Sequence, residues 1–258
     1  MRSIFREPYR TAAFGGQNAG DGVPYGFFFT VRKNMFTILR PDKTTVIRGV
    51  LFDLDGVVID TEKLFSRFWI EAAQSLGYSM TRDQSLQLRS LGTLLGQPKL
   101  ESFFGPGVSY AAIRARRVAL MDAYIAEHGV EEKKGIRELL ARLKEKGIPC
   151  AITSSSSIPV IRRHLTALGL IDGFTALCSG KDVPRGKPEP DIYLRGAASI
   201  GVKPENCLAI EDSPAGIESA WRAGCMPIIV PDLDHPDDLT LSRCFARADS
   251  LLDVMELV

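Results

Sequence analysis

The sequence predicts an α/β fold, in which a parallel sheet forms the core and a group of helices is inserted after the first strand. After residue 130, short apolar runs alternate with segments of helical periodicity, a pattern typical of parallel strands joined by helices. Between residues 61 and 129, apolar residues instead recur at helical spacing without strand-like alternation. A chain of 258 residues, 45% of them hydrophobic, is long enough for one core with an inserted module.

The expected strands are apolar runs, and the expected helices are amphipathic segments with recognisable ends. The first run, 46–53, is almost continuously apolar, which favours a central parallel strand. Further strands are expected at 149–152, 175–178, 206–210 and 226–230. Helices are expected at 62–76, 136–146, 160–168, 191–200, 214–223 and 251–257. Pro214 stands at the favoured first position of its helix, and Gly224 stops that helix.

Residues 1–45 differ from the rest of the chain. They contain several glycine-rich turns and no sustained period, so we expect an irregular N-terminal extension. A translation start placed too early, with Met35 as the alternative, is one explanation for this extension. We therefore divide the chain into the extension, a core built from 46–60 and 130–258, and a helical insertion at 61–129.

Composition narrows the class of protein. The formal net charge of +1 favours neither nucleic acid nor an anionic membrane, and no apolar run approaches the roughly 20 residues that span a bilayer. The five cysteines show no metal-binding spacing and lie in apolar surroundings, which is typical of reduced, buried thiols. We therefore expect a cytoplasmic protein that acts on a small molecule, without a nucleic-acid or membrane partner.

The first predicted strand ends on two carboxylates, in the stretch Asp53-Leu54-Asp55-Gly56. Side chains alternate along a strand, so Asp53 and Asp55 are expected on the same side. Two adjacent carboxylates repel each other, unless a cation lies between them or one of them is protonated. This pattern points to a magnesium-dependent phosphoryl-transfer site.

Further polar residues follow other predicted strands. Thr153 and Ser154 end the second strand, and Glu211 and Asp212 end the fourth, while Lys187 lies in the loop after the third. The carboxyl ends of parallel strands meet at one edge of the sheet. We therefore expect these residues to meet the aspartate pair there.

Residues 46–230 resemble the haloacid dehalogenase-like superfamily of phosphohydrolases. The four motifs that carry the resemblance are Asp53-Leu54-Asp55-Gly56, Thr153-Ser154, Lys187-Pro188 and Glu211-Asp212-Ser213. The surrounding segments 186–193 and 211–217 resemble the branch that contains beta-phosphoglucomutase and small sugar-phosphate phosphatases. The resemblance implies a Rossmann-like core, with 61–129 as its helical cap.

The resemblance also implies a role for each motif residue. Asp53 is expected to be the nucleophile that forms an aspartyl-phosphate, and Asp55 the general acid and then base. Thr153 and the Ser154 amide are expected to bind the phosphoryl oxygens, and Lys187 to supply positive charge. A Mg²⁺ cofactor is expected on Asp53, the Asp55 carbonyl and Asp212, with Glu211 either a ligand or a neighbour of one.

The reaction expected is hydrolysis of a small phosphorylated metabolite, a sugar phosphate. A phosphosugar mutase of the beta-phosphoglucomutase type is the alternative, although 62–65 lacks the histidine of such mutases, and Ser156 and Ser157 stand where they carry a Lys-Asn pair. A metal-free dehalogenase would not need Asp55 or the acidic pair. A protein that only binds phosphorylated ligands would be expected to lack the nucleophile or the acid.

Overall fold

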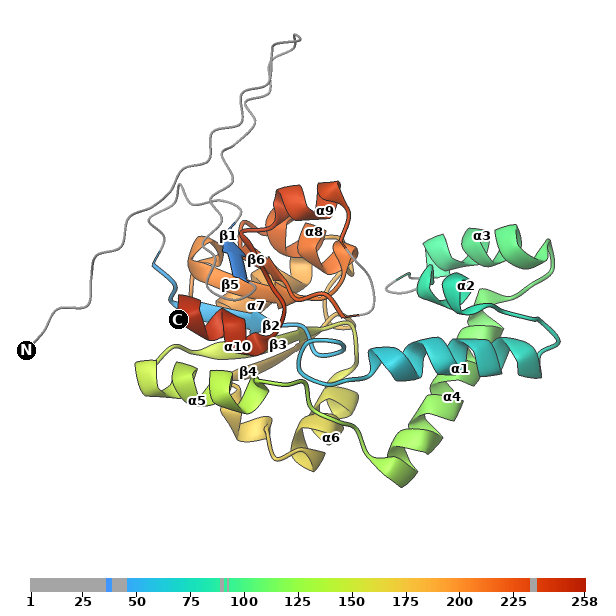
Figure 1. The fold of residues 1–258 in the computed structure, drawn as a ribbon, viewed down its shortest axis with the longest axis horizontal. Helices are drawn as coiled ribbons and strands as arrows, with labels where there is room; N and C mark the ends of the chain where they lie inside the picture. Colours follow the sequence, from blue (N-terminus) through green and yellow to red (C-terminus); the bar gives the residue numbers. More distant parts are fainter. Residues whose placement is uncertain (1–35, 39–45, 89–90, 92, 233–235) are drawn as a thin grey trace, which may run out of the picture.

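The core of the protein is one twisted sheet, shown in Figure 1. The computed structural model describes residues 36–38, 46–88, 91, 93–232 and 236–258. Among these, seven strands pair in the order β1-β7-β6-β5-β2-β3-β4. They are β1 (Phe36–Ile38), β2 (Gly49–Phe52), β3 (Cys150–Ser154), β4 (Ala176–Ser179), β5 (Cys207–Glu211), β6 (Met226–Ile229) and β7 (Ala246–Ala248). All neighbours are parallel except β1, which runs antiparallel to β7.

The predicted α/β fold is confirmed, with two differences at one end of the sheet. β7 was not predicted, because three residues with a charged centre, Arg247, show no period. β1 lies inside the stretch 1–45 that we predicted to be irregular, so that prediction is wrong for Phe36–Ile38. Backbone pairing with β7, which a local pattern cannot reveal, places these residues in the sheet. The other residues of that stretch lie outside the described residues.

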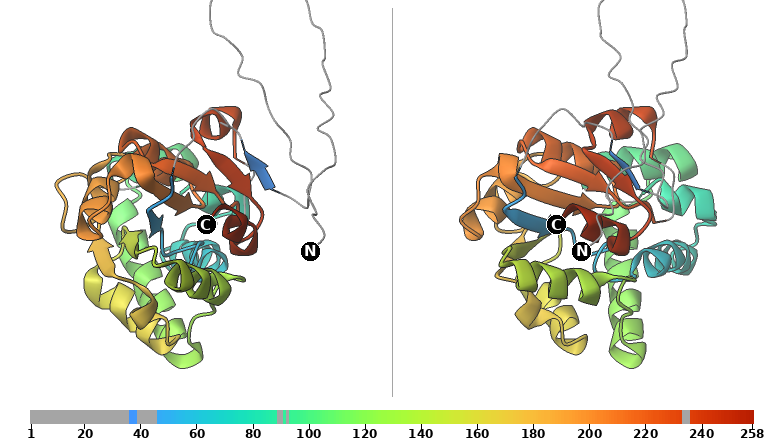
Figure 2. Two further views of the ribbon diagram at one scale, coloured as in Figure 1. Left: turned by 90° about the vertical axis from the view of Figure 1, so that its left-hand side faces the viewer. Right: turned by 60° about the vertical axis from the view of Figure 1, so that its left-hand side comes forward.

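Helices cover both faces of the sheet (Figure 2). They are α5 (Ile136–Lys146), α6 (Ile158–Ala167), α7 (Asp191–Ser199), α8 (Pro214–Arg222), α9 (Asp238–Arg243) and α10 (Leu251–Val254). The alternation of β2 divides the core into two layers. Val50 and Phe52 pack with residues of α5, α6 and α10, whereas Leu51 packs with residues of α7 and α8. The apolar run of β2 is thus buried on both faces, as its sequence predicts.

The helical insertion contains α1 (Glu62–Ser75), α2 (Arg82–Leu86), α3 (Thr93–Phe104) and α4 (Tyr110–His128). Figure 1 shows these helices beside the sheet, with α4 crossing α1 and in contact with it. They share an apolar cluster of their own, centred on Trp69, Tyr110 and Ile113. Two adjacent segments join the insertion to the core, and there the Asp60 amide donates to the Glu131 carbonyl at 2.8 Å.

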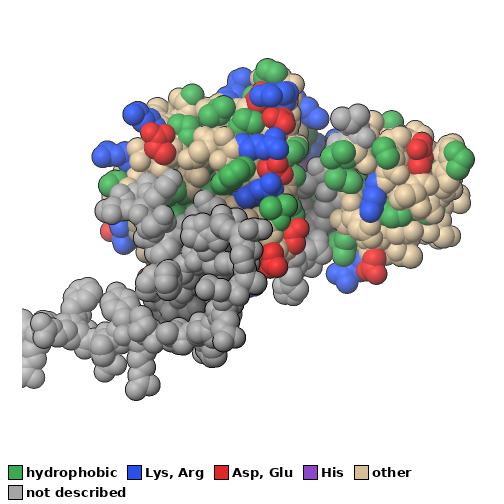
Figure 3. All heavy atoms as spheres, turned by 90° about the horizontal axis from the view of Figure 1, so that it is seen from above, with side chains coloured by type: hydrophobic (Ala, Val, Ile, Leu, Met, Phe, Trp, Pro, Cys, Tyr) green, Lys and Arg blue, Asp and Glu red, His purple; other side chains and the backbone are tan. Residues whose placement is uncertain are grey.

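The described part of the chain has buried thiols and, on one face, mixed surface charge. All five cysteines are free and buried, as predicted. On the face shown in Figure 3, basic and acidic side chains of the described residues are interspersed rather than gathered by sign. No helix in the described part of the chain is both long and apolar enough to cross a membrane. The cytoplasmic location stays a prediction.

Candidate active site

A cavity of about 310 Å³ lies where the carboxyl edge of the sheet meets the helical insertion. Its lining comes from the turn after β2, the loops after β3, β4 and β5, helices α1 and α4, and two leucines between α2 and α3. The lining residues from the core include Asp53, Asp55, Ser155, Ser156, Lys181, Lys187 and Asp212. Strands far apart in the sequence therefore bring most of the predicted site residues to one place, as the parallel topology requires.

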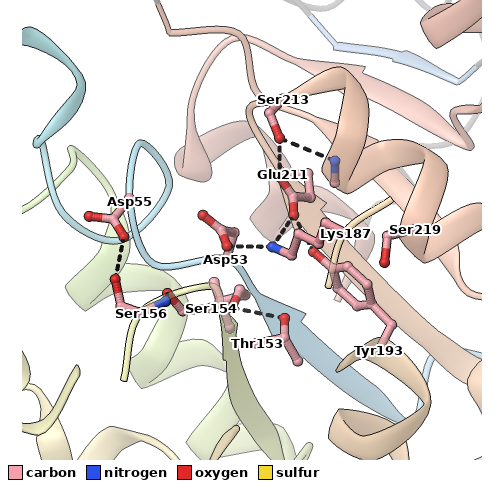
Figure 4. Close-up of polar contacts among 12 residues, drawn as sticks. Asp53, Asp55, Thr153, Ser154, Ser156, Lys187, Tyr193, Glu211, Ser213 and Ser219 are labelled. Carbon is pink, nitrogen blue, oxygen red and sulfur yellow. Dashed lines mark hydrogen bonds and ion pairs between the residues drawn. The ribbon is translucent and has the colours of Figure 1, made fainter. Parts of the chain in front are cut away.

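The turn after β2 directs two carboxylates into this cavity. Asp53 follows the last residue of β2, and its amide still donates to the Ile210 carbonyl of β5 at 3.0 Å. Gly56 then adopts a φ of 84°, a left-handed conformation that favours glycine, and reverses the chain. Asp55 sits within this turn, and Figure 4 shows its side chain apart from that of Asp53.

Two hydroxyl groups orient the Asp55 carboxylate. The Thr61 hydroxyl donates to one carboxylate oxygen at 2.8 Å, and the Ser156 hydroxyl donates to the other at 3.3 Å. Thr61 begins the helical insertion and Ser156 belongs to the loop after β3. The sequence placed neither hydroxyl beside Asp55, because both contacts depend on how the turn, the insertion and a second loop meet.

A buried ion-pair network surrounds Asp53 (Figure 4). The Lys187 ammonium lies 2.5 Å from Asp53 Oδ1 and 2.5 Å from Glu211 Oε1. The Tyr193 hydroxyl donates to the same Glu211 oxygen at 2.5 Å, and the Ser213 hydroxyl donates to the other at 3.2 Å. Glu211 thus holds Lys187 against Asp53. Sequence reasoning missed Tyr193, whose helical spacing in α7 is equally typical of a core residue.

The helix after β5 is shaped to accept Glu211. Ser213 caps α8 by accepting a hydrogen bond from the Gly216 amide at 3.2 Å. A Cβ atom at Gly216 would lie 1.9 Å from Glu211 Cδ, so only glycine leaves room for the carboxylate. Packing therefore explains why these three residues, Glu211, Ser213 and Gly216, occur at this spacing.

The carboxylate oxygens of Asp53, Glu211 and Asp212 lie within 4.8 Å of one another, and all three residues are buried. Mg²⁺ binds oxygen ligands, with carboxylates foremost, so the donor set fits this ion. Within this group, Lys187 forms ion pairs with Asp53 and Glu211. The Asp55 carboxylate is not in the group; the metal ligand proposed for Asp55 is its backbone carbonyl.

Burial and charge inside this network together shift the pKa values of Asp53 and Lys187. Burial raises the pKa of Asp53 to about 8; Lys187 opposes this rise, and the nearby Glu211 and Asp55 carboxylates add to it. Burial alone would lower the pKa of Lys187, but Asp53 and Glu211 outweigh it and the pKa rises. Lys187 is therefore positively charged at neutral pH. A divalent cation among these carboxylates would favour the charged, nucleophilic form of Asp53.

The structure does not bring the Thr153 hydroxyl, which we predicted to bind phosphate, into the cavity. Thr153 is 0% exposed, and its hydroxyl donates to the Phe52 carbonyl at 3.2 Å. Its methyl group packs against α7, where a Cβ atom at Gly196 would lie 2.5 Å from it. Because side chains alternate along β3, the neighbouring Ser154 faces the other way, and its Oγ accepts from the Ser156 amide at 3.0 Å.

The helical insertion contributes the opposite wall of the cavity, which the sequence did not identify. Phe65 and Trp69 come from α1, and Tyr110, Arg114 and Arg117 come from α4. Their spacings of three and four residues place each set on one helix face. The same spacings occur in any helix packed on a core, so the sequence alone could not separate the two cases.

The sequence profile of the haloacid dehalogenase-like hydrolase family matches residues 50–230, more than half of the chain. The chain belongs to this family. The resemblance inferred from the four motifs is therefore confirmed. This haloacid dehalogenase-like protein carries the mostly parallel sheet, the carboxylates at the strand ends and the helical insertion in a single chain.

Similar proteins of this family include both phosphatases and mutases. Hexitol phosphatase A of Escherichia coli is 36% identical over 186 residues, which are 71% of this chain and 82% of that protein. Beta-phosphoglucomutase of Bacillus subtilis is 31% identical over 191 residues, 70% of this chain and 82% of that protein. The crystal structure of CbbY from Rhodobacter sphaeroides in complex with phosphate superposes with a TM-score of 0.66 at 27% identity, covering 80% of this chain and 95% of CbbY.

Proposed function

We propose that this protein is a magnesium-dependent phosphatase that hydrolyses a small phosphorylated sugar. The observation that carries this proposal is the meeting of Asp53, Asp55 and Lys187 with a buried acidic cluster at one cavity. Its similarity to hexitol phosphatase A supports a phosphorylated sugar or sugar alcohol as the substrate class. The proposed hydrolysis requires only the residues of the core motifs.

Asp53 is the proposed nucleophile. Lys187 holds Asp53 Oδ1, and Figure 4 shows the second carboxylate oxygen pointing away from Lys187. That oxygen attacks the phosphorus atom, an aspartyl-phosphate bond forms, and the bond from phosphorus to the sugar oxygen breaks. Water then attacks the same phosphorus atom, which releases inorganic phosphate and regenerates Asp53.

Asp55 is the proposed proton carrier for both steps. In its protonated form it donates the proton to the departing sugar oxygen, and its carboxylate then takes a proton from the attacking water. The hydroxyl groups of Thr61 and Ser156 hold the carboxyl group in place between these steps. Its position on the turn after β2 keeps it beside, but separate from, the nucleophile.

Asp53, Asp212 and the Asp55 carbonyl are proposed to hold Mg²⁺, with Glu211 beside them. When bound, the ion supplies positive charge to the phosphoryl oxygens. Lys187 supplies further positive charge, and the Ser154 hydroxyl and the Ser155 amide are proposed to bind the remaining oxygens. Thr153 is proposed to support the 154–156 loop and not to bind the phosphate itself.

A mutase is the second candidate, because beta-phosphoglucomutase is among the similar proteins. Such a reaction returns the phosphoryl group to a sugar instead of water. Ser156, which stands where these mutases are expected to carry a lysine, is engaged with Asp55 and carries no positive charge. This observation favours water as the final acceptor.

The experiment that tests the proposal is phosphate release from a panel of sugar, sugar-alcohol and nucleotide monophosphates in the presence of Mg²⁺. We expect release from several sugar or sugar-alcohol phosphates, with nucleotides the poorest substrates. Interconversion of glucose 1-phosphate and glucose 6-phosphate, with no release from any member, would instead identify the mutase.

Removal of the metal is expected to lower the rate of phosphate release by about 100-fold or more, because the charge that it supplies is worth several kcal/mol in such reactions. Dialysis against a chelator followed by titration with Mg²⁺ measures this effect. Asp212→Asn should raise the Mg²⁺ concentration needed for half-maximal rate, while the exposed Asp172→Asn serves as the matched control. A rate unchanged by chelation would contradict the metal assignment.

A further inference from the structure

We infer that Tyr193 positions the Lys187 ammonium beside the nucleophile, its hydroxyl group acting through Glu211 and its aromatic ring acting directly. The inference rests on the proposed function, because it explains how the lysine that serves Asp53 is held. Tyr193 lies in α7, outside the four motifs and outside the lining of the cavity. It is therefore a positioning residue, which acts on the reaction through its neighbours and has no contact with the substrate.

Lys187 needs such support because of its place in the fold. It lies in the loop between β4 and α7, so neither a strand nor a helix fixes its backbone. A lysine side chain is a flexible four-carbon stem with a compact charge, and its ammonium has no preferred direction of its own. Only 9% of this side chain is exposed, and its position therefore depends on the groups packed around it.

The hydroxyl group of Tyr193 fixes the carboxylate that Lys187 contacts. It donates to Glu211 Oε1 at 2.5 Å, and Lys187 donates to the same oxygen at 2.5 Å. Ser213 donates to the other oxygen, and Gly216 closes the space beside the carboxylate, where even a Cβ atom would not fit. Tyr193 is 0% exposed, so water has no access to replace its hydroxyl group. Glu211 therefore presents Oε1 to Lys187 in one direction.

The ring of Tyr193 contacts Lys187 directly. The ring centre lies 5.2 Å from the Lys187 Nζ atom, a distance at which an aromatic face attracts a cation, most strongly where water is excluded. The ring belongs to the buried apolar cluster that also contains Leu51 of β2 and Ala151 of β3. One rigid side chain, packed in the core, thus contacts both the ammonium and the Glu211 carboxylate that holds it (Figure 4).

This arrangement prepares the ammonium for the reaction. A lysine ammonium has three N–H donors, and Asp53 and Glu211 each accept a hydrogen bond from Lys187. Lys187 also lines the cavity, so its third donor can reach a phosphoryl oxygen of the substrate there. Such a donor stabilises the transition state best when it is held in place before charge develops. Loss of the Tyr193 contacts is therefore expected to slow the chemical step more than it weakens substrate binding.

The test compares Tyr193→Phe, which keeps the ring and removes the hydroxyl group, with Tyr193→Leu, which removes both contacts. The substrate is the sugar or sugar-alcohol phosphate that the panel shows to be hydrolysed fastest, with saturating Mg²⁺. Tyr193→Phe is expected to lower kcat about 10-fold, as for the loss of one hydrogen bond to a charged group, while KM stays near the wild-type value. Tyr193→Leu should lower kcat further. Tyr78→Phe removes a tyrosine hydroxyl group from the helical insertion outside the cavity lining, and should behave like the wild type.

A double-mutant cycle shows whether Tyr193 acts through Lys187. Residues that act together give non-additive effects, whereas changes at independent sites add. Rates are measured with nitrophenyl phosphate in a single turnover, so that slow variants can be compared. In a Lys187→Met background, Tyr193→Phe is expected to lower the rate by less than about 2-fold, against about 10-fold in the wild-type background. Melting temperatures of all variants show whether each is folded.

Two results would overturn the inference. One is a kcat of folded Tyr193→Phe equal to that of the wild type; the other is an equal loss from Tyr193→Phe in the Lys187→Met and wild-type backgrounds. Either result leaves the phosphatase assignment intact, because the wild-type protein still releases phosphate. Absence of phosphate release by the wild-type protein from every member of the panel would overturn the proposed function, and the inference with it.

Discussion

Asp53→Asn is expected to reduce phosphate release by a factor of about 10⁴ or more, a loss of the size seen when an enzyme's nucleophile is removed. An amide oxygen is a poor nucleophile and cannot form the aspartyl-phosphate. The substitution keeps the size of the side chain, and its oxygen can still accept a hydrogen bond from Lys187. Lys187 also retains its ion pair with Glu211, so the fold should survive.

The measurement is a phosphate-release assay together with a rapid acid quench of labelled substrate. Wild-type protein should retain label on Asp53 during turnover, whereas Asp53→Asn should retain none. Asp172 is an exposed residue of the α/β domain, so Asp172→Asn controls for the effect of replacing an aspartate by an asparagine. Substantial turnover by a folded Asp53→Asn variant would rule out the covalent mechanism.

Asp55→Asn is expected to lower the rate with sugar phosphates by about 10²- to 10⁴-fold, the range for loss of a general acid and base. The expected loss depends on the leaving group. A nitrophenyl phosphate departs without a proton, so its first step should be nearly restored, and the slow second step should then accumulate aspartyl-phosphate. A burst of nitrophenol followed by a slow steady state is the signature to measure.

Thr61→Val is the matched comparison for Asp55. It removes one hydroxyl that donates to the Asp55 carboxylate at 2.8 Å but leaves the acid itself in place. The expected loss is about 10-fold, close to the contribution of one hydrogen bond to a charged group. An equal loss for sugar phosphates and nitrophenyl phosphate in Asp55→Asn would contradict its role as the acid.

Much of the site could be predicted from the sequence, because the chemistry is tied to strand ends. Asp53 follows β2, and Glu211 and Asp212 stand at the end of β5, which pairs directly with β2. Apolar runs reveal such strands, and parallel pairing then brings their ends together. Lys187 lies in the loop after β4, and because β4 ends at the same edge of the sheet, this loop places the Lys187 ammonium beside Asp53.

The structure differs from the expected site where the direction of a side chain decides its contacts. Thr153 and Ser154 are adjacent at the end of β3, and the sequence favours both equally. Alternation along the strand turns Thr153 toward the Phe52 carbonyl and α7 instead of the cavity. The true boundary of the strand is needed to assign the direction, and patterns locate boundaries only to within a few residues.

The α/β fold and the place of the helical insertion could be predicted from local patterns, and the carboxylates and the lysine of the core from their places after strands. The folded chain was needed to reveal three further features: the pairing of β1 with β7, the hydrogen bonds from Tyr193 and Ser213 to Glu211, and the cavity wall that carries Arg114 and Arg117. These contacts join segments that are distant along the chain. Their energy comes from packing and burial, to which no local pattern of residues responds.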